Sequence, residues 1–415
     1  MDIEVNYKNK KRYKTARYPA HQNKFWSGLI WVLSKMMLIG KDYRIEKIDM
    51  EGLKPPYMLL SNHMHFIDFE ITAMATGLQS VSNVVSIDGY VNLWFLLEWI
   101  GAICTRKYTT DIHLVKSIRK VLQRGDVLAM YPEARYTPCG TLAFLPDSLG
   151  KLIKMNKVPV VAVVHHGNHL YAPFWNVTSK RKVPMYATYK KILTPEQIET
   201  MSVAEINALL KKELHYDEYQ YQKDNGILIK EPDRAEGMHK VLYKCPHCMA
   251  EAMDSKGAEL FCTACGKRWT WQEDGYLKAN EGKTEFDHVP DWFDWERRQV
   301  AKEIEEGAYR FEDEVEVFSL PHIWKYIPLG KAKLTHDPEK GFQLEGHYRG
   351  ERYYINRQPA QTNSLHVEYN FTPIDGADYL DISTENDSFY CRPTKPNVLT
   401  KLAFATEELY LRSQK

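Results

Sequence analysis

The segment LLSNHMHFIDFEITA, residues 59–73, places two histidines and an aspartate directly after an apolar run. The run itself, Tyr57–Asn62, is continuously apolar in the manner of a strand that is covered on both faces. A helical pattern begins around residues 67–70, so His63 falls in the connecting loop and Asp68 in the first helical turn. Open α/β sheets bind ligands at the carboxyl ends of their strands. The segment therefore predicts a parallel sheet with a functional site at its edge.

The surrounding residues 46–235 continue this alternation of strands and helices. Strand-like apolar runs recur at Val84–Asp88, Val127–Glu133 and Val158–His166, and the segment DIHLVKSIRKVLQRGD between them has one apolar helical face. Strands that alternate with helices predict an α/β domain with a largely parallel, mixed sheet.

Three further regions flank this α/β domain. Residues 1–45 form a basic, helical segment; residues 240–275 carry two cysteine pairs; residues 285–415 contain many short β-like runs and end in a helical pattern, NVLTKLAFATEELYLRSQ. We expect the last region to be a small, mainly-β domain with a C-terminal helix, of pleckstrin-homology-like shape.

Composition excludes several classes of protein. A length of 415 residues favours two or three domains, and a hydrophobic fraction of 44% with 26% charged residues is ordinary for folded protein. The net charge of +1 argues against a broad nucleic-acid-binding surface. We expect no nucleic acid among the partners.

The two close pairs of cysteines have the spacing of a metal site. The pairs are CPHC, with Cys245 and Cys248, and CTAC, with Cys262 and Cys265. Two such knuckles supply four thiolates for a tetrahedral zinc ion. With seven cysteines in all, the pattern favours a reducing compartment and a structural zinc ribbon over a disulfide framework. His247, inside the first knuckle, is an alternative ligand that we expect to be exposed.

Three interpretations of His63 and Asp68 are open on spacing alone. The pair is a catalytic base with its orienting carboxylate, a metal site, or ordinary polar residues at a turn. His65 is an alternative base. A second polar elbow, AMYPEARYTPCG at residues 129–140, holds Glu133 and Arg135; an arginine at a strand exit suits phosphate, although a surface ion pair explains the same residues.

Taken together, these segments resemble the glycerolipid acyltransferase family of the 1-acylglycerol-3-phosphate type, over residues 25–220. The family's first motif, Asn-His-x-x-x-x-Asp, is matched by Asn62, His63 and Asp68. Its third motif, Phe-Pro-Glu-Gly-Thr-Arg-Ser, aligns with YPEARYT at residues 131–137. Here Ala134 replaces the usual glycine, the arginine stands one place early, and Tyr136 fills its customary position.

The remaining two family motifs match more loosely. The second, a glycine followed by an apolar pair and arginine, resembles GAICTRK at residues 101–107, where Arg106 falls one residue early and Lys107 takes the usual place. The fourth, an apolar strand around a proline, resembles Val158–Val164.

The resemblance implies transfer of an acyl chain from an acyl-CoA or acyl carrier protein thioester to a hydroxyl of a lysophospholipid. His63 would be the general base and Asp68 its orienting partner. The acceptor's phosphate would be bound by residues of the second and third motifs, namely Arg106, Lys107, Glu133, Arg135 and Tyr136.

Two segments have the composition of membrane-contacting helices. Phe25–Ile39 contains two tryptophans and follows basic residues (Lys10, Lys11, Arg12, Lys14 and Arg17), as interfacial helices do. Tyr90–Ile103 is the second candidate, and for both the alternative is a buried core helix. We expect a cytoplasmic protein that is peripheral at the inner face of the membrane.

Two other functions fit the same residues. One is an acyltransferase whose acceptor is a non-phosphorylated alcohol or an amine, because the arginine of the third motif is displaced. The other is an inactive, acyltransferase-like zinc-ribbon scaffold that only binds a partner.

Overall fold

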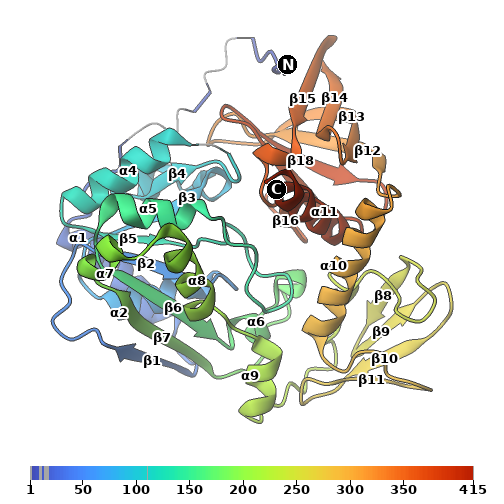
Figure 1. Ribbon diagram of the computed structural model, residues 1–415, viewed down its shortest axis with the longest axis horizontal. Coiled ribbons are helices and arrows are strands. Elements are labelled where there is room, and N and C mark those ends of the chain that lie inside the picture. The colour runs from blue at the N-terminus through green and yellow to red at the C-terminus, as the bar shows by residue number, and fades with distance from the viewer. Residues whose placement is uncertain (1, 9–11, 14–17, 110, 415) are drawn as a thin grey trace.

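The structure is a computed structural model that describes residues 2–8, 12–13, 18–109 and 111–414. Three β-sheets follow one another along the chain, and each occupies its own region of the molecule (Figure 1). The basic residues Lys10, Lys11, Lys14 and Arg17 lie outside the described residues.

The first sheet has seven strands in the order β1-β7-β6-β2-β5-β3-β4. Its strands are β1 (Tyr43–Ile48), β2 (Met58–Ser61), β3 (Val81–Ser86), β4 (Ile103–Thr105), β5 (Val127–Met130), β6 (Val160–His166) and β7 (Met185–Leu193). All neighbouring pairs are parallel except β6 and β7, which are antiparallel. This parallel-rich mixed sheet confirms the predicted α/β class.

Helices cover both faces of this sheet (Figure 1). The helices of this region are α1 (Lys24–Met37), α2 (Ile67–Thr76), η1 (Ile87–Tyr90), α3 (Trp94–Trp99), α4 (Ile112–Gln123), α5 (Ser148–Asn156), α6 (Asn168–Tyr171), η2 (Phe174–Asn176), α7 (Pro195–Thr200), α8 (Val203–Glu213) and α9 (Glu218–Asp224). One core lies between the sheet and α4, α5, α7 and α8. The opposite face of the sheet joins a larger core that also contains residues of the second and third sheets.

The second sheet is the small antiparallel sheet of the cysteine region. After η3 (Met238–Lys240) it comprises β8 (Met253–Lys256), β9 (Glu259–Cys262), β10 (Arg268–Trp271) and β11 (Leu277–Ala279), in the order β11-β10-β9-β8. The large side chains Trp269 and Trp271 are fully buried and anchor this sheet in the shared core.

The third sheet is antiparallel throughout and has seven strands, in the order β15-β14-β13-β12-β18-β17-β16. Its elements are α10 (Val289–Glu305), β12 (Phe311–Ser319), β13 (Ile327–Asp337), β14 (Gly341–Tyr348), β15 (Glu351–Arg357), η4 (Pro359–Gln361), β16 (His366–Glu368), β17 (Tyr379–Ser383), β18 (Ser388–Pro393) and α11 (Leu399–Ser413). The C-terminal helix was predicted and is present as α11, whereas the pleckstrin-homology-like shape stays a prediction.

The first residues of the chain pack against this C-terminal sheet (Figure 1). Ile3 and Tyr354 of β15 form an isolated antiparallel bridge, with N–H to carbonyl distances of 2.7 and 2.9 Å. The buried hydroxyl of Tyr7 donates a hydrogen bond to Asp387. Residues 2–8 thus act as a strap across the last domain.

Two strands differ from their predicted bounds. The strand expected at Val84–Asp88 lies at Val81–Ser86, because Val81, Ser82 and Asn83 already pair with β5. The polar Ser82 accepts a hydrogen bond from Arg124 at 3.0 Å. The strand expected at Val127–Glu133 ends at Met130. Within the described residues, the structure contains no helix whose length and hydrophobicity would let it cross a membrane.

Candidate active site

Four strands deliver polar residues to one edge of the first sheet. His63 follows β2, Asp88 follows β3, Lys107 follows β4 and Tyr131 follows β5. These strands are neighbours and run parallel, so their carboxyl ends meet at the same edge.

The imidazole of His63 and the carboxylate of Asp68 are in direct contact. The distance from His63 Nδ1 to Asp68 Oδ2 is 3.0 Å. A carboxylate only accepts hydrogen bonds, so Nδ1 carries the proton and Nε2 is left as the basic nitrogen. Among the described residues Nε2 has no hydrogen-bond partner, and 19% of the side chain is exposed. This geometry would suit a general base with an orienting carboxylate.

Asp68 is fixed by three further donors. Its Oδ2 also accepts hydrogen bonds from the backbone N–H groups of Met64 at 2.7 Å and His65 at 3.1 Å, and its Oδ1 accepts one from the Asn168 side chain at 2.6 Å. Asn168 begins α6 after Gly167, where a Cβ atom would lie 2.4 Å from the Pro184 carbonyl oxygen. Only glycine fits there, so the turn that delivers Asn168 depends on it.

The electrostatics of the pair favour the reactive protonation state. Burial would raise the pKa of Asp68, but the hydrogen bond from His63, the neighbouring imidazoles and Asn168 outweigh it and hold the value at about 2. Burial lowers the pKa of His63 below its usual value, although Asp68 opposes the shift. At neutral pH the imidazole is therefore uncharged and the carboxylate ionised.

Two tyrosine rings pack against the imidazole of His63. The ring stacks on Tyr131 with 3.7 Å between centroids and an interplanar angle of 15°, and it contacts Tyr136 at 4.2 Å. These contacts leave the ring one orientation, which a general base requires. Tyr136 thus lies beside the base, with its own pKa raised by burial.

Glu133 connects the two loops of the site. Its carboxylate accepts hydrogen bonds from the backbone N–H groups of His63 at 3.2 Å and Ala143 at 2.8 Å. In addition, the Thr137 N–H donates to the His63 carbonyl at 2.8 Å. Burial raises the pKa of Glu133 to about 7, although the hydrogen bonds oppose this. Glu133 therefore supports the loop that carries His63, the candidate base, through its backbone N–H.

Both arginines that were expected to bind phosphate are buried against the C-terminal domain. Arg106 donates to the Leu320 carbonyl at 2.9 Å and to the Ser388 hydroxyl at 3.0 Å. Arg135 forms an ion pair with Glu407 at 2.6 Å and donates to the Leu365 carbonyl at 3.2 Å. Their phosphate-binding role stays a prediction.

Lys107 is the basic residue that remains near His63. Its ammonium contacts Nε2 of His366, which belongs to β16 of the C-terminal domain. The charge of Lys107 contributes to lowering the pKa of His63. The first and last domains therefore meet beside the candidate base.

His65, the alternative base, is used differently. Its Nδ1 accepts a hydrogen bond from the Ile67 backbone N–H at 3.1 Å, at the start of α2. Its ring packs edge-on against Tyr171. Its ring nitrogen thus accepts the N–H of Ile67, the first residue of α2, and is engaged with the backbone.

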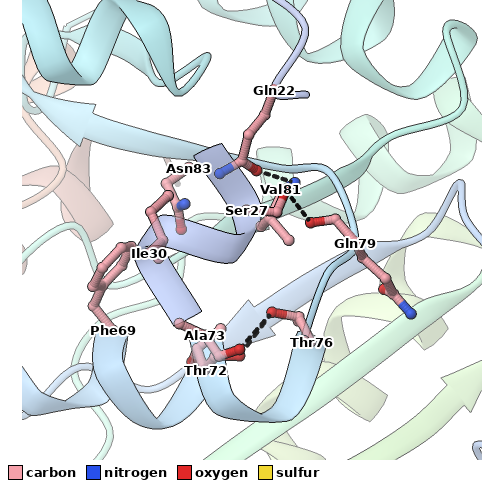
Figure 2. Close-up of a pocket in the computed structure, with 11 residues that line it drawn as sticks. Gln22, Ser27, Ile30, Phe69, Thr72, Ala73, Thr76, Gln79, Val81 and Asn83 are labelled. Atoms are coloured by element: carbon pink, nitrogen blue, oxygen red, sulfur yellow. Dashed lines mark hydrogen bonds between the residues drawn. The ribbon is translucent and has the colours of Figure 1, made fainter. Parts of the chain in front are cut away.

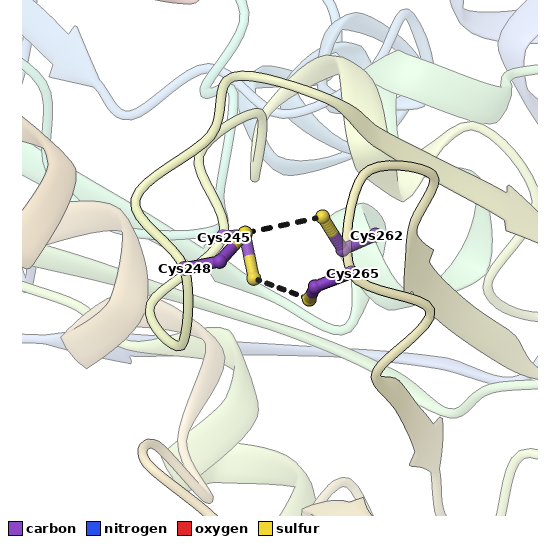
Figure 3. A group of neighbouring side chains, drawn as sticks. All are labelled: Cys245, Cys248, Cys262 and Cys265. Atoms are coloured by element: carbon purple, nitrogen blue, oxygen red, sulfur yellow. Dashed lines mark hydrogen bonds between the residues drawn. The ribbon is translucent and has the colours of Figure 1, made fainter.

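The four paired cysteines form one cluster (Figure 3). The Sγ atoms of Cys245 and Cys265 are 3.8 Å apart, and those of Cys248 and Cys262 are 3.6 Å apart. These separations are too long for a disulfide. They match the edge of about 3.8 Å that a tetrahedron with Zn–S bonds of about 2.3 Å has. The cluster therefore fits a zinc ion.

The helix α1 buries two serines fully and leaves several of its large apolar side chains exposed. Ser27 and Ser34 are its buried residues, and Ser27 donates to the Gln79 carbonyl at 3.1 Å beside a pocket between α1 and α2 (Figure 2). Phe25 and Met36 are among its exposed side chains, 70% and 60% accessible. Trp26 and Ile30 are partly buried against a small core that α3 also contacts, so α1 packs on the domain with one side and exposes large apolar residues on the other.

The exposed apolar surface continues onto α3. Trp26 of α1 contacts Trp99 of α3 with 5.3 Å between ring centroids. We define the α1–α3 face by its exposed large side chains, Phe25, Val32, Leu33, Met36, Met37, Trp94, Phe95 and Trp99. Its residues belong to the two segments, Phe25–Ile39 and Tyr90–Ile103, that were predicted from the sequence to contact a membrane.

Sequence reasoning missed several residues of the site. Asn168 had a usable signal, because it follows the apolar strand β6 at the same sheet edge as His63. Asp88 had the same signal after β3. His366 and Glu368 had none, because they lie on a three-residue strand in another domain.

Comparisons with known proteins give little guidance. No protein-family model matches the chain, and no curated protein matches it. Among solved structures, the chain is similar to the 1-acyl-sn-glycerophosphate (LPA) acyltransferase from Thermotoga maritima, with 12% sequence identity and a TM-score of 0.36. The match covers 45% of this chain and 78% of that one. A likeness this weak carries no argument, so the proposals below rest on the geometry of the site.

Proposed function

We propose that this protein is an acyltransferase that moves an acyl chain from a thioester to a hydroxyl group. The observation that carries the proposal is the His63–Asp68 pair, 3.0 Å apart, with a neutral imidazole whose Nε2 has no hydrogen-bond partner in the described part of the chain. A buried carboxylate behind a partly accessible histidine at the carboxyl edge of a parallel sheet is suited to removing a proton from an alcohol.

The proposed reaction needs no covalent intermediate on the protein. Nε2 of His63 takes the proton of the acceptor hydroxyl as its oxygen attacks the thioester carbonyl. Asp68 holds the Nδ1–H and stabilises the imidazolium that forms. The C–S bond then breaks, and the thiolate takes up the proton that His63 received. General-base help of this kind contributes about 10²–10⁴ in rate.

The proposed donor is acyl-CoA or an acyl carrier protein, and the proposed acceptor is a lysophospholipid. The burial of Arg106 and Arg135 against the C-terminal domain favours acceptors that do not depend on those two guanidinium groups. A non-phosphorylated alcohol or an amine is therefore the second candidate acceptor.

We also propose that the α1–α3 face binds the surface of a membrane. The exposed apolar side chains of α1 and α3 support this, because a contiguous surface of Met, Trp and Phe is costly in water. Exposed lysines on the same helix, Lys24 and Lys35, suit anionic headgroups. Docking there would give the protein access to substrates that partition into bilayers, at the cytoplasmic face as the sequence suggested.

A structural zinc ion completes the proposal. Cys245, Cys248, Cys262 and Cys265 would hold it with four thiolates and leave no open coordination position. Its role would be to fix the ribbon sheet whose tryptophans enter the shared core.

The test compares two neighbouring histidines. We expect His63→Asn to lower acyl transfer by about 10²–10⁴-fold, measured by mass spectrometry of lipid products with mixed acyl-CoA and acyl carrier protein donors. His65→Asn is the matched control, since it keeps an acceptor for the Ile67 N–H, and we expect its rate to stay near that of the native protein. Equal rates for His63→Asn and the native protein would contradict the proposal, as would a native protein that transfers no acyl group.

A further inference from the structure

A second polar cluster lies between the α/β domain and the C-terminal domain. Asp88, His366 and Glu368 each place a carboxylate oxygen or ring nitrogen within 4.8 Å of the others. Nε2 of His366 is 3.0 Å from Oε1 of Glu368, and it also contacts the ammonium of Lys107. A fourth acidic residue, Asp381, has its Oδ2 3.7 Å from Nδ1 of the same ring.

The position of this cluster connects it to the candidate base. Asp88 and Lys107 follow β3 and β4, which continue the sheet edge beyond β2 and β5. Tyr136, whose ring contacts His63, lines a narrow apolar pocket together with Val367, the residue between His366 and Glu368. The strand β16 therefore lies across the edge of the sheet, next to the base.

Several groups in the cluster are buried without a hydrogen bond. His366 is only 1% exposed; among the described residues its Nδ1 has no hydrogen bond, and Oδ2 of Asp381 lies 3.7 Å from it. Oδ1 of Asp88 and the hydroxyl of the fully buried Tyr390 also lack a hydrogen bond within that part of the chain. Buried polar atoms of this kind normally have a partner. The Asp88 oxygen can accept a hydrogen bond from a bound group, and the Tyr390 hydroxyl can accept or donate one.

The charges of the cluster indicate which chemical groups of a ligand it would bind. Three carboxylates, those of Asp88, Glu368 and Asp381, face one ammonium and one imidazole. A phosphate monoester would meet repulsion from these carboxylates, whereas hydroxyl and ammonium groups would donate to them. The ammonium of Lys107 already contacts the imidazole nitrogen that a metal would need, so a divalent cation is the weaker interpretation.

We propose that Asp88, Lys107, His366 and Glu368 form the headgroup subsite of the acceptor, and that they select a headgroup rich in hydroxyl or ammonium donors over a bare phosphate monoester. The inference rests on the proposed acyl transfer, because it assigns the acceptor of that reaction. It makes the C-terminal domain part of the active site, through two residues of β16 that touch the headgroup.

Direct binding tests the inference independently of turnover. In the His63→Asn protein, calorimetry would compare two lysophospholipids with the same short acyl chain, one with a phosphoglycerol headgroup and one with a phosphate monoester. We expect the phosphoglycerol lipid to bind at least about tenfold more tightly, a difference of about 1.4 kcal/mol. Equal binding, or tighter binding of the phosphate monoester, would overturn the inference.

Charge-neutral variants locate the preference. We expect Glu368→Gln and Asp88→Asn each to reduce it by roughly tenfold, since each removes one carboxylate from the cluster. Glu345→Gln, which removes an exposed carboxylate of the same domain, is the matched control and should leave the preference unchanged. A preference that survives both cluster variants would place the headgroup elsewhere.

Two further measurements keep the outcomes separate. Circular dichroism of each variant establishes that it is folded. Lys107→Arg keeps the positive charge and should preserve the preference, whereas Lys107→Met removes the charge and should weaken it. Stoichiometric binding of Mn²⁺ that Glu368→Gln abolishes would identify a metal site and overturn the headgroup assignment. If the protein selects the headgroup but the native protein transfers no acyl group, the proposed reaction is wrong and the subsite stands. If the native protein transfers acyl groups but binding shows no headgroup preference, only the subsite is wrong.

Discussion

Arg135 and Glu407 form a buried ion pair, 2.6 Å apart, that joins the edge of the first sheet to the last helix of the chain. Glu407 is 1% exposed, and it also pairs with Arg297 and accepts a hydrogen bond from Ser364 at 2.7 Å. The pair therefore ties the loop of the candidate base to α11.

Removing one partner of this pair should loosen the interface between the domains. Arg135→Met leaves the Glu407 carboxylate buried with fewer donors, at a cost of about 3 kcal/mol in the free energy of unfolding. Urea unfolding followed by tryptophan fluorescence measures the loss. Lys331→Met, which breaks an exposed pair with Glu314, is the control and should leave the midpoint unchanged.

Asp68→Asn should change both the rate and its pH dependence. The negative carboxylate favours the imidazolium and so raises the pKa of His63; without it that pKa falls further below the usual value. We expect kcat/KM to drop by about 10²–10³-fold and its acid limb to move to lower pH, measured between pH 4.5 and 8. In the native protein the limb should lie below the ordinary histidine pKa of about 6.5. An acid limb that Asp68→Asn leaves in place would argue for a purely structural carboxylate.

Metal removal should unfold the ribbon. Structural zinc sites contribute about 10–16 kcal/mol of binding free energy, which stabilises the fold around them. Native mass spectrometry should show one zinc per chain, lost in Cys248→Ser and kept in Cys104→Ser, whose cysteine is remote from the cluster. A strong chelator should then change the fluorescence of Trp269 and Trp271. A metal-free protein with an unaltered melting curve would refute the zinc assignment.

Ala134 adopts a left-handed backbone conformation, with φ of 55°. This conformation costs a residue with a Cβ atom about 1 kcal/mol relative to glycine. Substitution by glycine removes this cost, but the greater conformational entropy of glycine in the unfolded chain offsets part of the gain in stability. Ala134→Gly should therefore raise the stability by about 0.5 kcal/mol. Ala301→Gly, within α10, should instead lower it by about 1 kcal/mol. Thermal melts of the two variants should move in opposite directions.

The α1–α3 face should control binding to vesicles. Met36→Ser combined with Trp99→Ser removes two exposed apolar groups, 60% and 54% accessible. Each buried large side chain contributes about 1.5–3 kcal/mol, so we expect at least tenfold weaker sedimentation with anionic phospholipid vesicles. Leu411→Ser, at an exposed apolar residue on α11, is the control. Equal sedimentation of all three proteins would exclude this face as the contact.

The parallel core of the first domain could be predicted because its strands are continuously apolar. The runs at β2, β5 and β6 stood out for that reason, whereas β1 and β7 did not, since their exposed and half-exposed positions interrupt the pattern. The contact between His63 and Asp68 was also within reach, because strand, loop and helix start are adjacent in sequence.

The interface between the domains could not be predicted in the same way. A guanidinium group satisfies carbonyl and carboxylate oxygens as well as phosphate, so the sequence alone gave no reason to place Arg106 against Leu320 and Ser388. Local sequence patterns also could not predict that the three residues of β16 lie at the sheet edge formed by residues 58–130. Such pairings depend on how whole domains pack.

The bridge between Ile3 and Tyr354 has a consequence for synthesis of the chain. The ribosome makes the strap first, yet its docking strand β15 emerges about 350 residues later. Throughout translation the apolar side chains Val5 and Tyr7, buried in the finished protein, have no C-terminal sheet to cover them. Closure of the strap therefore waits until β15 has been made, and products truncated before β15 would leave residues 2–8 undocked and accessible to proteases.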